Sequence, residues 1–485
     1  MARQIYQFRG FSRFFWLSFG AKLTIFSLII NLCLPISWVA AATSSKNLPE
    51  PLFEGIPLAC YVFNAKSSTP AEGNALAQAF SLTEIAEQYN QSKQFDRAQA
   101  TLGLSLDYAK NSLASDRDKA YGLVQIAKAM VKAESKLKAT EVLASSETLL
   151  PAIYGRDRVF VLLAIADGYR ELGEAEKSIE LLDQTLTTAN SLDDKYAKGR
   201  ILVEAAHIYS QIPEFTDRSQ EILNQDLDFT KTFSNPAAAA RIQLEIAASY
   251  ARQGKTETAN ETVDTALKSL DKESNLIEAI AYEYLASAYL SVKNLDAAIS
   301  VVEKMPDSYT KALQLSAIAD LQIEDKQIKQ GELNNQRSLE IFSSLEDAAK
   351  TTQGFSKVAK TYRKLGQTTK AVELLKQGIT LALRSEETAD KVIALIAIAE
   401  TFDQIGQNNR AMQTLDQAYE IAIQAERKSE RPTLVAAVTG GFGAIGDYNR
   451  AFDIARGTAD LPSRSQLMRL YECAAEVSTK SLSKV

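Results

Sequence analysis

Apolar residues recur at intervals of three and four along most of the chain, which is the spacing of one face of an α-helix. The clearest unit reads Ile-Ala-x-x-Tyr, as at Ile85-Ala86 with Tyr89, and later units vary the residues but keep the register. We call the last residue of each unit its anchor. The anchors are residues 89, 130, 169, 209, 250, 289, 322, 362, 402 and 442, and all steps between them but one are 39 to 41 residues. A fixed period of this length predicts a repeat architecture.

Each unit continues in a similar order after its anchor. Gly follows four residues later in five copies, at Gly173, Gly254, Gly366, Gly406 and Gly446. Ala follows nine residues later in seven copies, at Ala98, Ala139, Ala259, Ala298, Ala371, Ala411 and Ala451. A Gly at the end of a helix suits a residue with positive φ, and facing small residues let two helices approach closely. The pattern therefore predicts two amphipathic helices in each repeat, A and then B, joined by a tight turn.

This order of small residue, aromatic anchor, turn Gly and helix B Ala resembles the tetratricopeptide repeat over residues 76–460. The resemblance implies an all-α fold, a right-handed superhelical solenoid of about ten helix-turn-helix repeats. The chain departs from the family in having no Trp after Trp38 and a period near 40 rather than 34 residues, so another helical-hairpin solenoid is the alternative. Pro306 lies at the one short step and predicts a shortened helix B, while Pro213 stands where a turn Gly is expected.

The first 42 residues have the pattern of an export signal. Residues 1–22 are basic, residues 23–42 carry no charge, and Val39-Ala40-Ala41-Ala42 offers small residues for cleavage. The apolar stretch is also about as long as a membrane-spanning helix, so a cleaved signal peptide and an uncleaved anchor in the inner membrane are both open. Either interpretation places the rest of the chain outside the cytoplasm, in the periplasm or secreted.

Two further segments flank the repeats. Residues 43–75 hold several Pro, Ser, Asn and Gly residues and are interpreted as a linker or lead-in, and residues 461–485 are expected to form a capping helix and a tail. Cys60 lies in the first segment and Cys473 in the second. Because each repeat of a solenoid contacts only its neighbours, we expect these two thiols to remain unpaired.

Charge narrows the range of partners. The formal net charge is -6, and removing residues 1–42, which hold four basic and no acidic residues, leaves 50 basic against 60 acidic residues. An acidic body argues against a nucleic-acid partner. Contact with a membrane is expected only through the N-terminal segment, if that segment is not cleaved.

The sequence offers little catalytic chemistry. His207 is its one histidine, and the two cysteines outside the leader have no metal-ligand spacing. Gly441, Gly443 and Gly446 match a dinucleotide-binding loop, but the repeat register accounts for them, with Phe442 as the anchor and Gly446 in the turn. We expect no catalytic residue, no cofactor, no metal site and no enzymatic activity.

One face of helix A lines a concave groove in tetratricopeptide repeats, so the resemblance implies groove positions two residues before and one after each anchor. The charged and polar groove residues singled out here are Glu87, Asn90, Lys128, Asp167, Arg170, His207, Asp320, Lys360, Arg363, Glu400 and Asp403. These positions vary while the packing positions repeat, which favours an exported scaffold that binds a peptide or partner helix of unknown identity. An accessory subunit or factor in envelope or polysaccharide assembly and a purely structural spacer are the alternatives.

Overall fold

A computed structural model describes residues 56–67, 75–268, 275–461 and 464–482. All regular secondary structure in these residues is helical, which confirms the predicted all-α solenoid of helix-turn-helix repeats. The segment interpreted as a signal or anchor, residues 1–42, lies outside the described residues. None of the described helices is long and apolar enough to cross a membrane.

Each repeat consists of a helix A, which carries the anchor, and a helix B. The A helices are α4 (Ala75–Gln91), α6 (Asp116–Lys132), α8 (Gly155–Leu172), α10 (Lys195–Ser210), α12 (Pro236–Arg252), α14 (Asn275–Ser291), α16 (Tyr309–Glu324), α18 (Ala348–Lys364), α20 (Thr388–Gln404) and α22 (Arg431–Ala444). The B helices are α5 (Phe95–Lys110), α7 (Lys136–Glu147), α9 (Ala175–Ala189), α11 (Thr216–Thr230), α13 (Thr256–Lys268), α15 (Leu295–Lys304), α17 (Ile328–Ser344), α19 (Thr368–Ala382), α21 (Asn408–Ile423) and α23 (Tyr448–Gly457). Two more helices flank these, α3 (Leu58–Ser67) and α24 (Arg464–Leu482).

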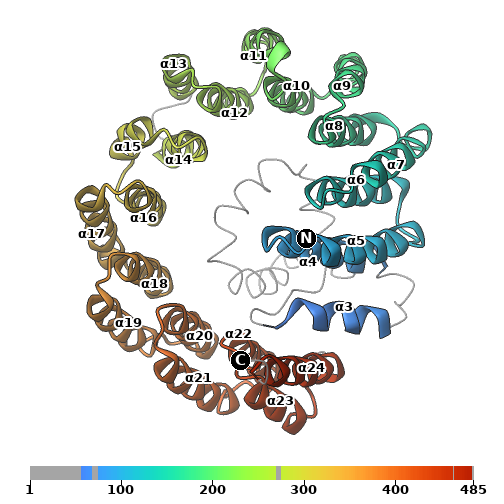
Figure 1. Ribbon diagram of the computed structural model, residues 1–485. Coiled ribbons are helices and arrows are strands. Elements are labelled where there is room, and N and C mark those ends of the chain that lie inside the picture. Colours follow the sequence, from blue (N-terminus) through green and yellow to red (C-terminus); the bar gives the residue numbers. More distant parts are fainter. Residues whose placement is uncertain (1–55, 68–74, 269–274, 462–463, 483–485) are drawn as a thin grey trace, which may run out of the picture. The chain divides into compact units, whose positions relative to one another are not determined.

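The helices belong to two compact units, which are described separately. The N-terminal unit contains residues 61–301, and the C-terminal unit contains residues 302–482 together with residues 56–60. Within each unit the A helices form an inner row and the B helices an outer row (Figure 1). Helix B of the sixth repeat ends at Lys304, just before Pro306, as the sequence predicted.

The turn between helices A and B has one conformation in nearly every repeat. The residue four after the anchor has a positive φ, between 74° and 94° at the five turn glycines. The backbone amide of the next residue donates to the carbonyl of the anchor, as from Glu174 to Tyr169 at 2.9 Å and from Gln407 to Phe402 at 2.7 Å. Four repeats hold the same positive φ without Gly, at Lys93, Glu134, Lys293 and Lys326. In the fourth repeat Pro213 replaces the turn with a short 3₁₀ helix, Pro213–Phe215.

The non-glycine turns predict an available gain in stability. A non-glycine side chain in the left-handed region costs roughly 1–2 kcal/mol. Replacing it with Gly removes this cost, but Gly also gives the unfolded chain more conformational freedom, which offsets part of the gain. Glu134→Gly should therefore raise the free energy of unfolding by about 0.5–1 kcal/mol in urea denaturation. The control is Glu141→Gly in the middle of α7, where Gly should cost about 1 kcal/mol. Equal destabilisation by both changes would contradict the left-handed turn.

A carboxyl group is enclosed in the packing of the fourth and fifth repeats. Asp226 on α11 is fully buried, and neither of its carboxyl oxygens has a hydrogen-bond partner among the described residues. It lies against Gly199 of α10, where an added Cβ would be 3.3 Å from Asp226 Oδ1 and also 3.3 Å from Ile242 of α12. Burial, reinforced by Glu245 and opposed by Lys198, raises the pKa of Asp226 to about 8.

Asp226 should therefore make stability depend on pH. A raised folded-state pKa means that the folded chain holds the proton more tightly than the unfolded chain, whose carboxyl titrates near about 4. The stabilisation is complete below about pH 4 and is lost as pH rises through about 8. Asp226→Asn should be more stable than the parent at pH 8, by about 1–3 kcal/mol, and this advantage should shrink at pH 5. Urea titrations between pH 5 and pH 8 test this expectation. If the free energy of unfolding of the two proteins changed with pH in the same way, ionisation of Asp226 would be excluded as the cause.

The expectation that the two cysteines stay unpaired is wrong. Cys60 on α3 forms a disulfide with Cys473 on α24, with their Cα atoms 5.7 Å apart and 413 residues between them in sequence. Both residues belong to the C-terminal unit. Distance along a repeat array fixes the path of the chain and not the separation of two points in space, so spacing in sequence could not exclude the pair. Helix α3 also lies inside the segment interpreted as a linker or lead-in.

The disulfide can be counted. Thiol labelling of the denatured, unreduced chain should find no free thiol once residues 1–42 are removed and one, Cys33, if they are retained. Reduction should expose two more in either form. Cys473→Ser should release one thiol at Cys60, which serves as the control. Two free thiols in the unreduced chain without its leader would contradict the disulfide.

Candidate binding face on the inner helices

One stripe of side chains on each helix A faces away from the packed core. On a helix with about 3.6 residues per turn, the positions nine, five and two before the anchor and two after it lie opposite the anchor. We call these positions the inner stripe. Anchors such as Tyr169 and Tyr250 are buried, whereas stripe residues such as Asp167 and Glu245 keep partial exposure. The stripe is therefore the part of helix A that a bound molecule can reach.

Stripe residues of α6 and α8 form a charge network in the N-terminal unit. Lys128 Nζ lies 2.5 Å from Asp167 Oδ2 and 2.9 Å from Glu171 Oε1. Arg170 contacts the same two carboxylates at 2.7 and 3.3 Å. Burial opposes the charged form of Asp167, but Lys128 and Arg170 outweigh it and lower the pKa of Asp167. The network is charge-balanced and holds two neighbouring A helices in register.

Helix α10 brings two titratable groups of unusual protonation to the same stripe. Burial, followed by the charge of Asp167, raises the pKa of Glu204 to about 7. Burial and the nearby Arg252 lower the pKa of His207 to about 4, so its imidazole is neutral at pH 7. Gln211 Nε2 lies 2.7 Å from His207 Nε2. Near neutral pH this part of the stripe carries less charge than its residues suggest.

The C-terminal unit has a separate charged stretch on α16 and α18. Asp320 accepts from Lys357 at 3.0 Å and from the Thr361 hydroxyl at 2.8 Å, and Lys364 lies 3.3 Å away. Burial opposes the ionised form of Asp320, but these partners lower its pKa. Arg363 is exposed. Two lysines of α18 thus share the carboxylate of Asp320, and Lys364 also lies 3.7 Å from Glu324.

The groove residues singled out from the sequence have different surroundings. The structure brings Lys128, Asp167 and Arg170 together, with His207 on the next helix A. Glu87 pairs instead with Lys132 at 3.0 Å, and Asn90 donates to the backbone carbonyl of Ala129. In the C-terminal unit, Asp320 joins the network on α18 while Lys360, Glu400 and Asp403 are half-buried along the inner row.

Sequence reasoning missed three of the four stripe positions. The positions nine and five before the anchor and two after it hold Arg200, Glu204, Glu245, Glu171, Lys357 and Lys364. Their spacing of three and four residues from the chosen positions is a signal that the sequence contains. The position one after the anchor lies instead at the edge of the helix toward a neighbour, which is why Asn90 bonds to the backbone of α6.

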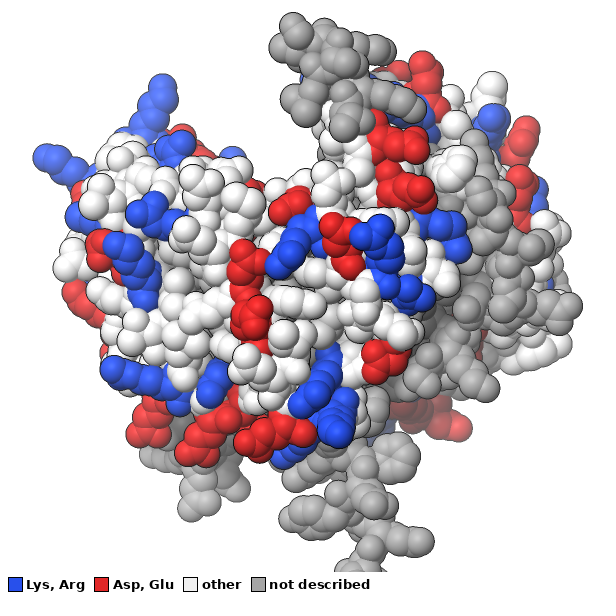
Figure 2. Space-filling view, turned by 90° about the horizontal axis from the view of Figure 1, so that it is seen from below, with Lys and Arg blue, Asp and Glu red and all other residues white. Residues whose placement is uncertain are grey.

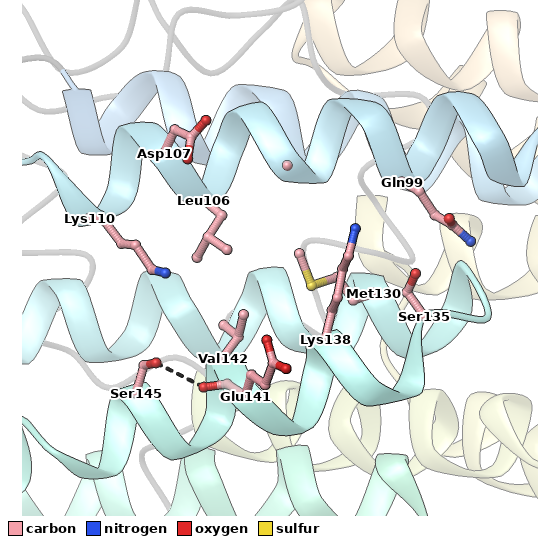
Figure 3. A pocket seen from close by; sticks show the side chains of 11 residues that line it. Gln99, Leu106, Asp107, Lys110, Met130, Ser135, Lys138, Glu141, Val142 and Ser145 are labelled. Atoms are coloured by element: carbon pink, nitrogen blue, oxygen red, sulfur yellow. Dashed lines mark hydrogen bonds between the residues drawn. The ribbon is translucent and has the colours of Figure 1, made fainter.

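A second cleft lies in the outer row, between α5 and α7. It has a volume of about 380 Å³, with Leu106 and Val142 facing each other across it and Lys110, Lys138 and Glu141 around them (Figure 3). Gly103 helps to keep it open, because a Cβ there would meet no atom within 4 Å. The cleft is lined by α5, α7 and Met130 of α6, whereas the inner stripe continues across each unit.

Surface charge elsewhere is mixed. In the space-filling view, Lys and Arg are interspersed with Asp and Glu over the face shown (Figure 2). Among the described residues, no group of three or more His, Cys, Asp or Glu residues is arranged to hold a metal ion.

One known protein family matches part of the sequence. The model of the tetratricopeptide repeat matches residues 355–384, which contain the anchor Tyr362, the turn Gly366 and the helix B Ala371. The chain is a tetratricopeptide-type repeat protein. No curated protein sequence matches it.

Several solved structures have a similar arrangement of helices. Ton1535 from Thermococcus onnurineus NA1 is 11% identical over 81% of this chain and 99% of its own, with a TM-score of 0.31. A signal-transduction ATPase with a tetratricopeptide repeat sensor from Pyrococcus horikoshii is 18% identical over 74% of this chain and 51% of its own, with a TM-score of 0.29. Yeast Tom70 is 13% identical over 83% of this chain and 96% of its own, with a TM-score of 0.28. Similarity at this level carries no argument about what the repeats bind.

Proposed function

We propose that this protein is an exported, non-catalytic scaffold whose inner stripe binds a peptide or helix of another protein. The observation that carries the proposal is the contrast between two sets of positions on helix A. The packing Ala, such as Ala247 and Ala399, is buried and repeats in nearly every copy. The stripe changes from repeat to repeat and carries charged side chains that are only partly buried.

The energetics of the stripe favour a binding role. Half-buried charges that already pair with one another lose little rotamer freedom when a partner arrives, so binding costs less conformational entropy. A groove with fixed charges also gives specificity more than raw affinity. Because the packing positions set the fold, the stripe is free to match one partner.

Two observations support export. Residues 23–42 are apolar and end in small residues suited to cleavage. The Cys60–Cys473 disulfide belongs to an oxidising compartment, since thiols are kept reduced in the cytosol. We place the protein in the periplasm or outside the cell on these grounds.

Affinity capture with crosslinking tests the binding role. Lys360→Gln with Arg363→Gln, called the stripe variant, removes one stripe charge and the exposed charge one residue after the same anchor. Lys376→Gln with Arg384→Gln, called the outer variant, removes two exposed charges outside the stripe, on and just after α19 in the outer row. The stripe variant should lose most of the captured partner and the outer variant should keep it, while both melt close to the parent because such substitutions usually change stability by less than about 0.5 kcal/mol. Equal capture by the two variants would reject the inner stripe as the binding face.

A packing variant separates binding from folding. Ala399→Leu adds volume at a fully buried contact between helices and should cost about 1–3 kcal/mol of stability. It should lower the melting temperature without abolishing capture below the transition. If the stripe variant is destabilised as much as Ala399→Leu, its charges are structural.

A further inference from the structure

One part of the inner stripe is short of negative charge. Glu245 on α12 is shared by two guanidinium groups, with Oε2 3.5 Å from Arg200 Nε and Oε1 3.9 Å from Arg241 Nε. Both distances are longer than a charge-assisted hydrogen bond, which measures about 2.7–2.9 Å. The side chains of Arg200 and Glu245 are 13% and 12% exposed, so this weak pairing lies in a recessed site.

Lys128 and Arg117 of the N-terminal unit are better paired. Lys128 has two carboxylates within 3 Å, and Arg117 at the start of α6 contacts Asp118 at 2.8 Å and Asp157 at 3.5 Å. Glu204, one turn beyond Arg200, forms no ion pair with it, and burial keeps Glu204 partly protonated near neutral pH. In the α10–α12 cluster, two arginines thus share the single carboxylate of Glu245.

Two polar atoms of the same cluster make no hydrogen bond, although one of them, Arg200 Nε, has the 3.5 Å ion pair to Glu245. Tyr196 Oη and Arg200 Nε are enclosed, and neither makes a hydrogen bond with any described residue. The guanidinium of Arg241 lies over the ring of Tyr196, 5.8 Å from its centroid. An enclosed donor without an acceptor costs about 1–3 kcal/mol. The cluster therefore lacks a hydrogen-bond acceptor, and the positive charge of its arginines favours a negatively charged acceptor.

We propose that Tyr196, Arg200 and Arg241 bind the carboxylate of an acidic side chain in the partner segment. The proposal deepens the scaffold function and rests on it. A planar guanidinium matches a carboxylate with two parallel hydrogen bonds, and Arg241 is 54% exposed, so it offers the open side of the site. Glu245 holds the arginines in place before binding and competes with the incoming carboxylate for them.

Because Glu245 competes with the incoming carboxylate, its removal should strengthen binding, which would not be expected if the three residues formed only a structural ion-pair triad. Burial raises the pKa of Glu245 despite the nearby Arg200 and Arg241, so the pairing does not fully compensate its desolvation. Glu245→Gln removes the internal competitor and should strengthen binding of an acidic peptide several-fold. Arg241→Gln removes an open donor and should weaken binding by about ten-fold or more.

The experiment uses fluorescence anisotropy with the full chain at low salt. The probe is a labelled decapeptide of alternating Ser and Glu, acetylated and amidated so that it has no terminal charge, and its counterpart has Gln in place of Glu. Arg156→Gln is the matched control, because Arg156 on α8 is 50% exposed and lies 3.8 Å from Asp194 outside the cluster. Thermal melts confirm that each variant is folded, and Tyr196→Phe, which removes only the hydroxyl, provides a second variant.

The expected result is binding of the Glu peptide but not the Gln peptide, weakening by Arg241→Gln and Tyr196→Phe, strengthening by Glu245→Gln, and no change with Arg156→Gln. The proposal is overturned if Glu245→Gln weakens binding, if Arg156→Gln acts like Arg241→Gln, or if the two peptides bind equally or not at all. Such a failure leaves the scaffold function standing as long as capture of the partner still depends on the stripe.

Discussion

The close approach of helix A to helix B is the contact on which the rest of the protein depends. Nine of the ten A helices have an Ala three residues before the anchor, and seven B helices have an Ala nine residues after it, all of them fully buried. The approach requires the chain to reverse within about four residues, which the left-handed turn achieves by bonding a backbone amide to the anchor carbonyl. Contact and turn together fix the face that helix A presents, and hence the inner stripe.

The features that repeat could be predicted from the sequence, and those that depend on neighbouring repeats could not. Gly173 and Gly446 predicted left-handed turns, and Pro306 predicted the end of a helix B. The partners of Lys128 could not be predicted, because they depend on the axial offset between each helix A and the next. The Cys60–Cys473 bond was missed for the same reason: spacing along an array says nothing about distance through space.

The stripe has two kinds of charge with different consequences. Balanced sets, such as Lys128 with Asp167 and Glu171, compensate their own desolvation and tie adjacent helices together. A set with an unfilled donor or an excess of one sign stays costly until something binds, because burial weakens solvation without supplying a partner. The second kind offers a partner an interaction that the folded chain leaves unmade, whereas the first offers a surface whose charges are already fixed. The arginines of α10 and α12 are of the second kind.

The long period of this chain bears on where that site lies. Helix A reaches 16 to 18 residues in α6, α8, α10 and α12, so its stripe extends a full turn or more before the conserved spacing of small residue and anchor begins. Tyr196, Arg200 and Arg241 all lie in this early part, thirteen or nine residues before their anchors. The residues that pack the repeat lie later in each helix. A shorter helix A would keep the packing unit and lose the cluster, so the added length supplies the surface of the proposed site without altering the contact that holds the repeats together.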